Sequence, residues 1–218
     1  MKHTLKNIIR NVKSIKGNSL AEFATTTALM ATLAATAAPK LSEMSEGTKA
    51  EKSKNEIDKI LTQARNHYQD TANDEGRGRF PGQEKFNVPV GGYGTERSTQ
   101  EMAITDQTAL VTALGAWVDY DDDEGQNWRS VFGTSDAPAA SQVTNDGVDS
   151  DCDTCNDHIG HVEWLERFGD NELTSQYQDG HFAYAVIPGG GSGEAAFPPV
   201  LYVVDIENAS DFNNVIEP

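Results

Sequence analysis

Two cysteines and two histidines lie within ten residues of one another, at Cys152, Cys155, His158 and His161. Thiolates and imidazoles are ligands that zinc prefers, so these four side chains are a candidate tetrahedral set. One ligand at every third residue is tight for a tetrahedron, however, and no second pair stands at zinc-finger spacing. Asn156 occupies the place of the histidine that a haem-attachment motif requires. In an oxidising compartment we therefore expect Cys152 and Cys155 to form a short-loop disulfide, with zinc binding as the alternative.

Carboxylates at alternating positions surround the cysteine pair and recur earlier in the chain. Hard cations such as Ca²⁺ take several oxygen ligands from carboxylates and carbonyls in a turning loop. An EF-hand beginning at Asp149 is excluded, because Thr154 stands in place of its glycine and Gly160 in place of its bidentate glutamate. The sequence leaves two alternatives: an irregular loop that binds Ca²⁺, or an acidic surface that faces solvent and binds no ion. The candidate ligands of such a loop are Asp121, Asp123, Asp146, Asp149, Asp151, Asp153 and Asp157.

Sequence signatures of catalysis are missing. There is no nucleophile elbow, no phosphate-binding loop and no metalloprotease helix motif. The Gly-rich run 189–193 follows a proline and precedes no helical pattern, so we interpret it as a hairpin loop. An extracytoplasmic hydrolase has only scattered carboxylates in its favour, and we expect no enzymatic activity.

The acidic excess extends along most of the chain. The 218 residues include 34 Asp and Glu against 17 Lys and Arg, for a net charge of −17. Five of the basic residues and no acidic residue precede Gly17, so the chain from Asn18 onward has 12 basic residues and a net charge of −22. Phosphate binding needs the opposite sign, which excludes nucleic acid as a partner and favours cations.

A long helix is predicted over residues 18–71. Pro39 is the only proline in this range, and apolar residues keep helical spacing after it. We expect this stripe to contact a head domain, and we expect Pro39 to kink or loosen the helix, with a helix start at Pro39 as the alternative. The stripe consists of Leu41, Met44, Ile57, Ile60, Leu61, Ala64 and Tyr68.

The rest of the chain predicts a small α+β head. The spacing of a capping box at residues 98–101, followed by helical periodicity, predicts a second helix near 99–117, and residues 162–165 suggest a short one. The aromatic and β-branched runs 182–188 and 200–206 predict two antiparallel strands. The fold class is therefore α+β, with a long N-terminal helix and a small antiparallel sheet.

The N-terminal region combines a basic leader, a membrane-length apolar run and one carboxylate. Lys2, Lys6, Arg10, Lys13 and Lys16 precede Gly17, and Glu22 is the only charged residue between Ser19 and Ala38. With Gly17, Glu22 and Pro39 in this register, the chain resembles type IV pilins and the pseudopilins of type II secretion. In that family a membrane peptidase cuts after the glycine, Glu is the fifth mature residue, and Pro is usually the twenty-second. Asn18 stands where the family prefers Phe.

The resemblance implies an organisation and a set of partners. Residues 1–17 correspond to a cleaved leader, 18–71 to a spine helix whose part 18–39 enters the membrane and then the filament core, and 72–218 to an extracytoplasmic head. The cut falls between Gly17 and Asn18, and Glu22 and Pro39 serve assembly. The implied partners are further copies of the chain in a helical homopolymer, a prepilin peptidase, an inner-membrane assembly platform and the membrane before assembly.

The resemblance also implies a place and a role. The precursor belongs in the inner membrane and the product in an extracellular filament, either a surface pilus for cell adhesion or a secretion pseudopilus. The step Gly78-Arg79-Phe80-Pro81 looks like the Gly-Arg-aromatic-Pro step that follows the long helix in major pseudopilins. Those proteins hold a structural Ca²⁺ in a C-terminal loop, although their Asp-Pro-Trp-Gly-type motif is missing here.

One alternative concerns how the chain leaves the membrane. Small residues at 34–38 have the spacing that an ordinary signal peptidase recognises. A cut there releases a secreted or surface protein that binds Ca²⁺ or glycans instead of a filament subunit. This alternative requires an unusually long basic region that ends at Glu22.

Overall fold

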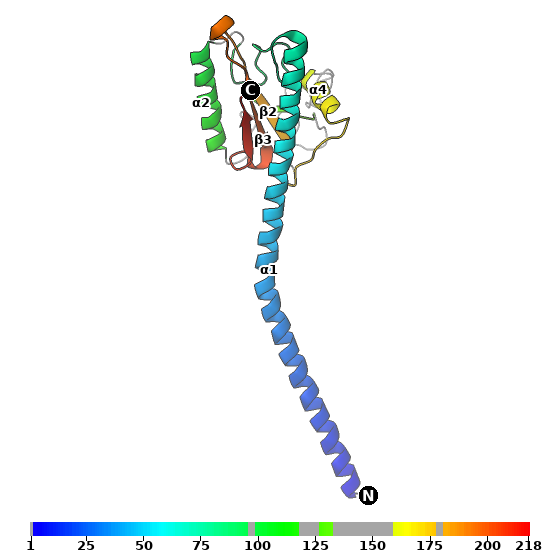
Figure 1. The fold of residues 1–218 in the computed structure, drawn as a ribbon. Helices are drawn as coiled ribbons and strands as arrows, with labels where there is room; N and C mark the ends of the chain where they lie inside the picture. Colours follow the sequence, from blue (N-terminus) through cyan, green and yellow to red (C-terminus); the bar gives the residue numbers. More distant parts are fainter. Residues whose placement is uncertain (1, 96–98, 118–126, 133–158, 178–180) are drawn as a thin grey trace, which may run out of the picture. The chain divides into compact units, whose positions relative to one another are not determined.

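The computed structural model describes residues 2–95, 99–117, 127–132, 159–177 and 181–218, with residues 2–19, Ile159 and His161 described by their backbone alone. The chain forms two compact units, Met1–Thr48 and Lys49–Pro218. We call the second the head unit. The expected α+β class, with a long N-terminal helix and a small antiparallel sheet, is confirmed (Figure 1).

Helix α1 (Lys2–Glu75) begins well before Asn18, where the sequence predicts its start. Pro39 lies inside it, so the alternative of a helix start at Pro39 is wrong. The helix ends at Glu75, four residues beyond the predicted end at residue 71. Gly76 adopts a φ of +83° and its N–H donates to the carbonyl of Ala72 at 3.1 Å, the left-handed conformation with which glycine commonly terminates helices.

The sheet of the head unit has four antiparallel strands in the order β1 (Arg129–Ser130), β2 (Phe182–Ile187), β3 (Val200–Asp205) and β4 (Asn213–Ile216). The two predicted strands are β2 and β3, which pair along their full lengths with Tyr184 opposite Val203. Strands β1 and β4 were not predicted. They pair with β2 and β3 respectively and form the two edges of the described sheet.

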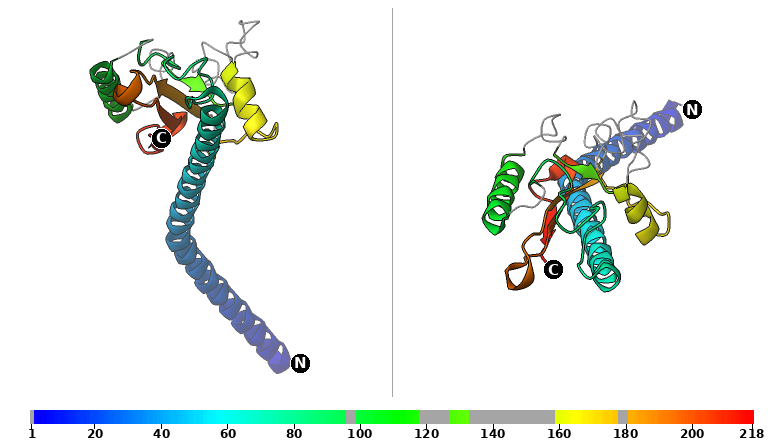
Figure 2. Two further views of the ribbon diagram at one scale, coloured as in Figure 1. Left: turned by 45° about the horizontal axis from the view of Figure 1, so that its top comes forward. Right: turned by 90° about the horizontal axis from the view of Figure 1, so that it is seen from above.

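Helices cover both faces of this sheet. On one face, Tyr184 and Leu201 pack in a core cluster with Ile60 of α1 and Trp164 of α4 (Ile159–Arg167). On the other face, Ala185 and Tyr202 pack in a second cluster with Leu110 and Leu114 of α2 (Gln100–Ala116). Alternate residues of β2 and β3 therefore enter opposite clusters, and every residue of both strands is buried. Figure 2 shows the sheet between α2 on one side and α1 and α4 on the other.

The predicted second helix is confirmed as α2, with its cap shifted by one residue. Thr99 is the N-cap, and its hydroxyl accepts a hydrogen bond from the N–H of Met102 at 3.3 Å. Met102 therefore occupies the position at which a capping box places glutamate, and Glu101 instead lies in the first turn. The short helix predicted at 162–165 is the middle of α4.

The predicted apolar stripe of α1 divides between the two units. Ile57, Ile60, Leu61 and Ala64 are buried in the head unit, as expected. Leu41 and Met44 belong to the N-terminal unit, where they are 65% and 70% exposed. Ser53 is the first buried residue of α1 in the head unit, although it does not belong to the predicted apolar stripe.

Candidate assembly site and polar clusters of the head unit

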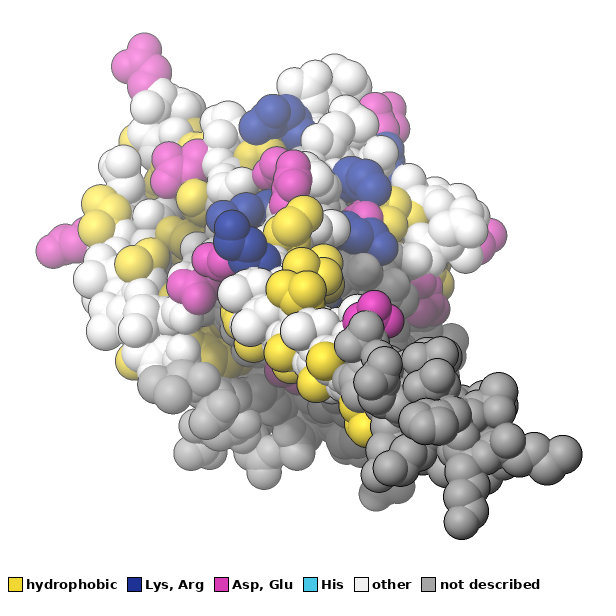
Figure 3. Space-filling model, turned by 90° about the horizontal axis from the view of Figure 1, so that it is seen from below, with side chains coloured by type: hydrophobic (Ala, Val, Ile, Leu, Met, Phe, Trp, Pro, Cys, Tyr) yellow, Lys and Arg dark blue, Asp and Glu magenta, His cyan; other side chains and the backbone are white. Residues whose placement is uncertain are grey.

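The described side chains of the N-terminal unit are almost all exposed. Leu20, Phe23 and Met30 are exposed over 70%, 71% and 72% of their surface. Apolar side chains, in yellow, lie at the surface when the molecule is seen from below (Figure 3). Residues 20–39 span about 30 Å as a helix, which matches the hydrocarbon thickness of a bilayer. Among the described residues this is the one helix long and apolar enough to cross a membrane, with a mean hydropathy of 1.2 in its apolar window, and it fits an anchor or a signal sequence.

Five threonines interrupt the apolar composition of this segment, and each bonds to its own helix. The hydroxyl of Thr27 donates to the carbonyl of Phe23 at 2.7 Å, and that of Thr36 donates to the carbonyl of Thr32 at 3.0 Å. The same pattern holds for Thr25, Thr26 and Thr32. Because an unpaired hydroxyl is costly to place in an apolar medium, these bonds make the segment more compatible with lipid or protein surroundings than its composition suggests.

Glu22 and Pro39 are both exposed residues of α1. The backbone carbonyl of Glu22 accepts bonds from Thr25 and Thr26 at 2.9 Å each, and no described residue contributes a salt bridge to its carboxylate. Pro39 has no backbone N–H, so the carbonyl of Ala35 receives no helical bond from that position. Gly17 and Asn18 lie in the part of α1 described by its backbone alone.

The predicted metal and disulfide residues lie outside the described residues. They are Asp121, Asp123, Asp146, Asp149, Asp151, Asp153, Asp157, Cys152 and Cys155. Within the parts of the chain that the structure describes, no group of three or more His, Cys, Asp or Glu side chains could hold a metal ion. Calcium, zinc and the disulfide stay predictions.

Arg79, in the segment that follows α1, connects that segment to α4. Its Nη1 donates to the carboxylate of Glu163 at 2.6 Å and to the carbonyl of Gln83 at 3.0 Å, while its Nε donates to Glu75 at 3.0 Å. The second oxygen of Glu163 accepts the N–H of Gly82 at 2.7 Å. The side chains of Arg79 and Glu163 are only 13% and 12% exposed. This charge pair therefore fixes the chain immediately after the long helix, which gives the Gly-Arg-Phe-Pro step a structural role.

His67 of α1 lies beside the same charge pair. Its Nε2 is 3.4 Å from Nη1 of Arg79 and 3.8 Å from Glu163. Burial, together with the positive charges of Arg167 and Arg79, lowers the pKa of His67 from 6.5 to about 4. The imidazole is therefore neutral at ordinary pH, which lets Nε2 accept from Arg79. Arg167 of α4 forms a further ion pair with Asp70 of α1.

A second buried carboxylate lies at the end of β3. Asp205 is fully buried, and its Oδ2 accepts hydrogen bonds from the hydroxyls of Ser53 at 2.9 Å and Ser175 at 2.7 Å. Burial raises the pKa of Asp205, although the two serine hydroxyls and the N–H of Glu207 act in the opposite direction. The cluster fastens α1 to the sheet and leaves no route for solvent to the carboxylate, so it fits a structural role better than a catalytic one.

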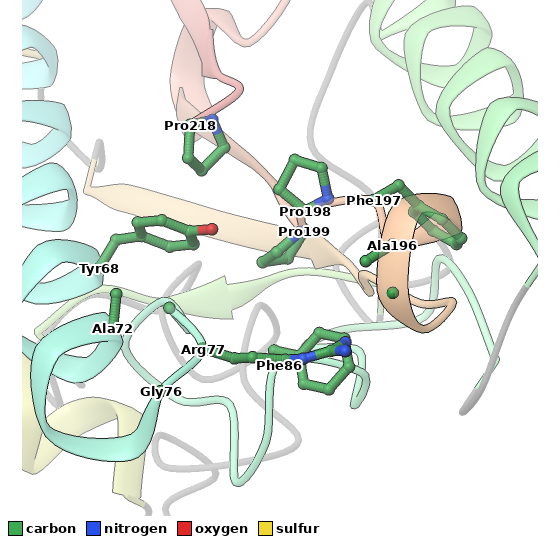
Figure 4. Close-up of a pocket in the computed structure, with 12 residues that line it drawn as sticks. Tyr68, Ala72, Gly76, Arg77, Phe86, Ala196, Phe197, Pro198, Pro199 and Pro218 are labelled. Atoms are coloured by element: carbon green, nitrogen blue, oxygen red, sulfur yellow. The ribbon is translucent and has the colours of Figure 1, made fainter.

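The head unit also carries an open cavity of about 570 Å³ with aromatic and proline walls. Tyr68 faces Pro198 and Pro199 across it, and Arg77 lies along the ring of Phe86 (Figure 4). The guanidinium carbon of Arg77 is 4.4 Å from the centroid of that ring, and its Nη1 donates to the carbonyl of Gly191 at 3.2 Å. Such a volume and composition are typical of ligand pockets, but none of these contacts selects a ligand class.

The polar clusters were not foreseen because their partners are far apart in sequence. Glu163 lies 84 residues from Arg79, and Asp205 lies 152 residues from Ser53. A charged residue in an amphipathic pattern normally indicates a solvent-facing position, so no local signal distinguished Glu163 from its exposed neighbour Glu166. The position of Arg79 directly after the helix was the one usable hint.

Comparison of the chain with protein-family models, with curated proteins and with solved structures found no match.

Proposed function

We propose that this chain is a type IV pilin-like subunit, made as a membrane-held precursor, cut after Gly17 and assembled through its N-terminal helix into an extracellular filament. One observation carries the proposal. Residues 20–39 form one uninterrupted helical segment with exposed apolar side chains, internally bonded threonines and a lone carboxylate at Glu22. An exposed apolar surface along 20 helical residues needs a cover of lipid or protein. The membrane supplies that cover for the precursor, and neighbouring helices of the polymer supply it after assembly.

The position of Glu22 favours assembly over simple anchoring. A membrane anchor gains nothing from a carboxylate, whose transfer into the bilayer centre costs about 2.5–3.5 kcal/mol on insertion scales. In a polymer, the free amine of a neighbouring mature N-terminus is a partner of opposite charge at the same depth. Pairing offsets much of the desolvation cost of the two charges. This accounts for the carboxylate near the start of the segment.

The head unit supports a structural role. Its sheet is covered on both faces, and its buried charges are held by partners within the unit. These features favour a stable outward-facing domain that performs no reaction of its own. Whether the filament is a pilus or a secretion pseudopilus then depends on what the head contacts.

The N-terminus of the mature protein tests the proposal. The chain is expressed in a bacterium that has a prepilin peptidase, and the product is analysed by intact mass and N-terminal sequencing. A terminus at Asn18 supports the proposal. A terminus between Ala34 and Pro39 contradicts the proposal and supports the secreted alternative. An uncut chain also contradicts the proposal.

Assembly is tested with Glu22→Ala and the matched control Glu43→Ala, which removes another exposed carboxylate of α1. We expect normal cleavage in both variants, filaments in electron micrographs of the control, and no filaments for Glu22→Ala. Normal filaments from Glu22→Ala would show that the carboxylate does not serve assembly.

A further inference from the structure

The connection between β3 and β4 contains the sequence Asn208-Ala209-Ser210, which we call the sequon. Asparagine in the pattern Asn-X-Ser or Asn-X-Thr, where X is any residue except proline, is the acceptor of N-linked oligosaccharides in exported proteins. No other asparagine among the 218 residues has Ser or Thr at the second following position. Because so short a pattern also arises by chance, the structure around it decides whether an oligosaccharide fits there.

The sequon lies in a turn that is held without its two polar side chains. The backbone carbonyl of Asn208 accepts the N–H groups of Asp211 at 3.1 Å and Phe212 at 2.8 Å, and Ala209 is fully buried. Asn208 is half-buried and Ser210 is exposed. Within the described parts of the chain, neither the side-chain amide of Asn208 nor the hydroxyl of Ser210 forms a hydrogen bond. A sugar on the amide nitrogen therefore breaks no hydrogen bond of the fold.

An open hollow of about 330 Å³ lies between this turn and α1. Asn213, which lines the hollow, donates from its side-chain amide to two backbone carbonyls of the sequon, at 2.7 and 3.1 Å. On the α1 side, Asp58 accepts from Asn214 at 3.2 Å, and the ammonium of Lys54 lies 5.7 Å from the centroid of the Phe212 ring. Amides, carboxylates and ammonium groups are the partners that sugar hydroxyls need, and the volume is in the range of small-molecule sites.

An oligosaccharide at the sequon would also protect an edge of the sheet. Strand β4 begins shortly after Ser210, and three of its four residues are exposed. An edge strand offers unpaired backbone groups to a strand of another molecule. A bulky, hydrophilic chain of sugars beside β4 opposes such pairing, which is most useful where many copies of the head unit are held close together.

We propose that Asn208 carries an N-linked oligosaccharide whose first sugar lies in the hollow beside the sequon. The donor is an oligosaccharide on a lipid pyrophosphate. A bond forms between Nδ2 of Asn208 and the anomeric carbon of the first sugar, while the bond from that carbon to the pyrophosphate oxygen breaks. The lipid pyrophosphate leaves with the electron pair, and Nδ2 loses one of its two protons. The step needs an exported head unit, which the proposed function and the secreted alternative both supply.

The test uses the full chain purified from the cells that produce it, analysed by intact mass and by glycopeptide sequencing with electron-transfer fragmentation. Wild type should carry an added mass equal to a whole number of sugar residues, located on Asn208. The variants Asn208→Gln and Ser210→Ala should lose at least about 90% of this modification. Ser210→Thr keeps the required hydroxyl and should retain it, as should the control Asn66→Gln at an exposed asparagine outside any sequon.

Two results would overturn the attachment. One is a wild-type chain without added mass, and the other is an added mass that persists in Asn208→Gln or lies on another residue. Loss in Asn208→Gln with full retention in Ser210→Ala likewise contradicts an N-linked sequon, because that linkage requires the hydroxyl.

Hydrogen exchange tests the place of the first sugar. Backbone amides of residues 211–214 should exchange at least about threefold more slowly in the modified wild type than in Asn208→Gln and Ser210→Ala, because the sugar covers the hollow that these residues line. The two variants should agree with one another, since both leave the hollow open. Equal rates in all three proteins would show that the sugar lies outside the hollow and would overturn that part of the proposal.

The outcome is separable from that of the proposed function. Asn208→Gln should still be cut after Gly17 and form filaments, whereas Glu22→Ala should form none but keep the modification. A bare Asn208 on a chain that begins at Asn18 and forms filaments refutes only the glycosylation. A modified Asn208 on a chain that begins between Ala34 and Pro39 refutes only the proposed function.

Discussion

The hydroxyl of Ser53 donates to the carboxylate of Asp205 at 2.9 Å, joining α1 to the end of β3 across 152 residues of sequence. Ser175 donates to the same oxygen at 2.7 Å. Both hydroxyls therefore depend on one buried acceptor. Removal of that acceptor and removal of its charge are different changes, and the structure predicts different outcomes for them.

Asp205→Ala should lower the free energy of unfolding by about 1–3 kcal/mol, because two hydroxyls in the head unit lose their acceptor. Asp205→Asn keeps an oxygen for both serines and removes the buried charge, but its amide nitrogen no longer accepts the N–H of Glu207, so we expect a smaller loss of stability than for Asp205→Ala at pH 7. Urea unfolding followed by tryptophan fluorescence measures this, since the three tryptophans all lie buried in the head unit. Equal losses in both variants would show that the charge itself is stabilising.

The raised pKa of Asp205 gives this test a pH dependence. The folded chain holds the proton more tightly than the unfolded chain, in which the ordinary value is 3.8. Its contribution to stability is therefore greatest in acid and declines as pH rises above that value. Asp205→Asn should lack this decline. A wild-type profile that instead gains stability relative to Asp205→Asn as pH rises would contradict the predicted direction.

The stability contributed by His67 should depend on pH in the direction opposite to that of Asp205. Its pKa of about 4 in the folded chain, against 6.5 ordinarily, means that the unfolded chain takes up a proton first as pH falls. The stability contributed by neutral His67, which faces Arg79, Arg167, Asp70 and Glu163, is lost between about pH 6.5 and 4. In His67→Gln the free energy of unfolding should fall less over that window. Parallel profiles for wild type and His67→Gln would contradict the lowered pKa.

Removal of one partner from the ion pair of Arg79 and Glu163 should strongly destabilise the head unit. Glu163→Ala leaves a mostly buried guanidinium without this partner and should destabilise the head unit by about 3 kcal/mol, with Glu163→Gln costing less. Glu166→Gln, at an exposed position of the same helix, is the control and should change stability by less than about 0.5 kcal/mol. Similar small losses for Glu163→Ala and the control would exclude a structural role for the pair.

Alanine substitutions at two glycines should change the free energy of unfolding in opposite directions. A methyl group on Gly78 would lie 2.4–2.5 Å from ring atoms of Tyr68, so Gly78→Ala should destabilise by roughly 1–3 kcal/mol as the ring is displaced. Nothing lies within 4 Å of a methyl group on Gly115 in α2, and Gly115→Ala should stabilise by up to about 1 kcal/mol through helix propensity. Thermal melts of both variants check the pair, and a neutral Gly78→Ala would show that Tyr68 moves freely.

The central part of the fold could be predicted from sequence because its signals are local. Residues 182–187 and 200–205 are continuous runs of aromatic, alanine and β-branched residues, which suit strands buried on both faces. Arg129–Ser130 and Asn213–Ile216 carry no such signal. They become strands because β2 and β3 offer them free edges, and pairing of that kind depends on tertiary context.

The candidate assembly site was more predictable than the polar clusters for a similar reason. Glu22 and Pro39 are recognised by their register in a single segment. Glu163 and Asp205 acquire their roles only from partners brought together by folding, and nothing near them in sequence distinguishes them from solvent-facing carboxylates. The burial of Ser53 and the exposure of Met44 follow from where the head unit begins, which periodicity alone does not mark.

Thr32→Val together with Thr36→Val tests whether the threonines of the N-terminal segment serve only their own helix. Each hydroxyl already has acceptors within α1, so the double variant should be retained in membranes and form filaments as wild type does. Carbonate extraction and electron microscopy measure the two properties. Loss of filaments with normal membrane retention would reveal a bond from these hydroxyls to a neighbouring subunit.

The internal bonding of these threonines also bears on how reversible the assembly is. A segment whose hydroxyls are satisfied within its own helix breaks none of those bonds when its surroundings change from lipid to protein. The exchange then trades one set of dispersion contacts for another of similar strength. In the proposed filament, the threonines therefore do not oppose return to the bilayer, and within this segment the preference for the assembled state comes from Glu22, whose carboxylate gains a partner only in the polymer.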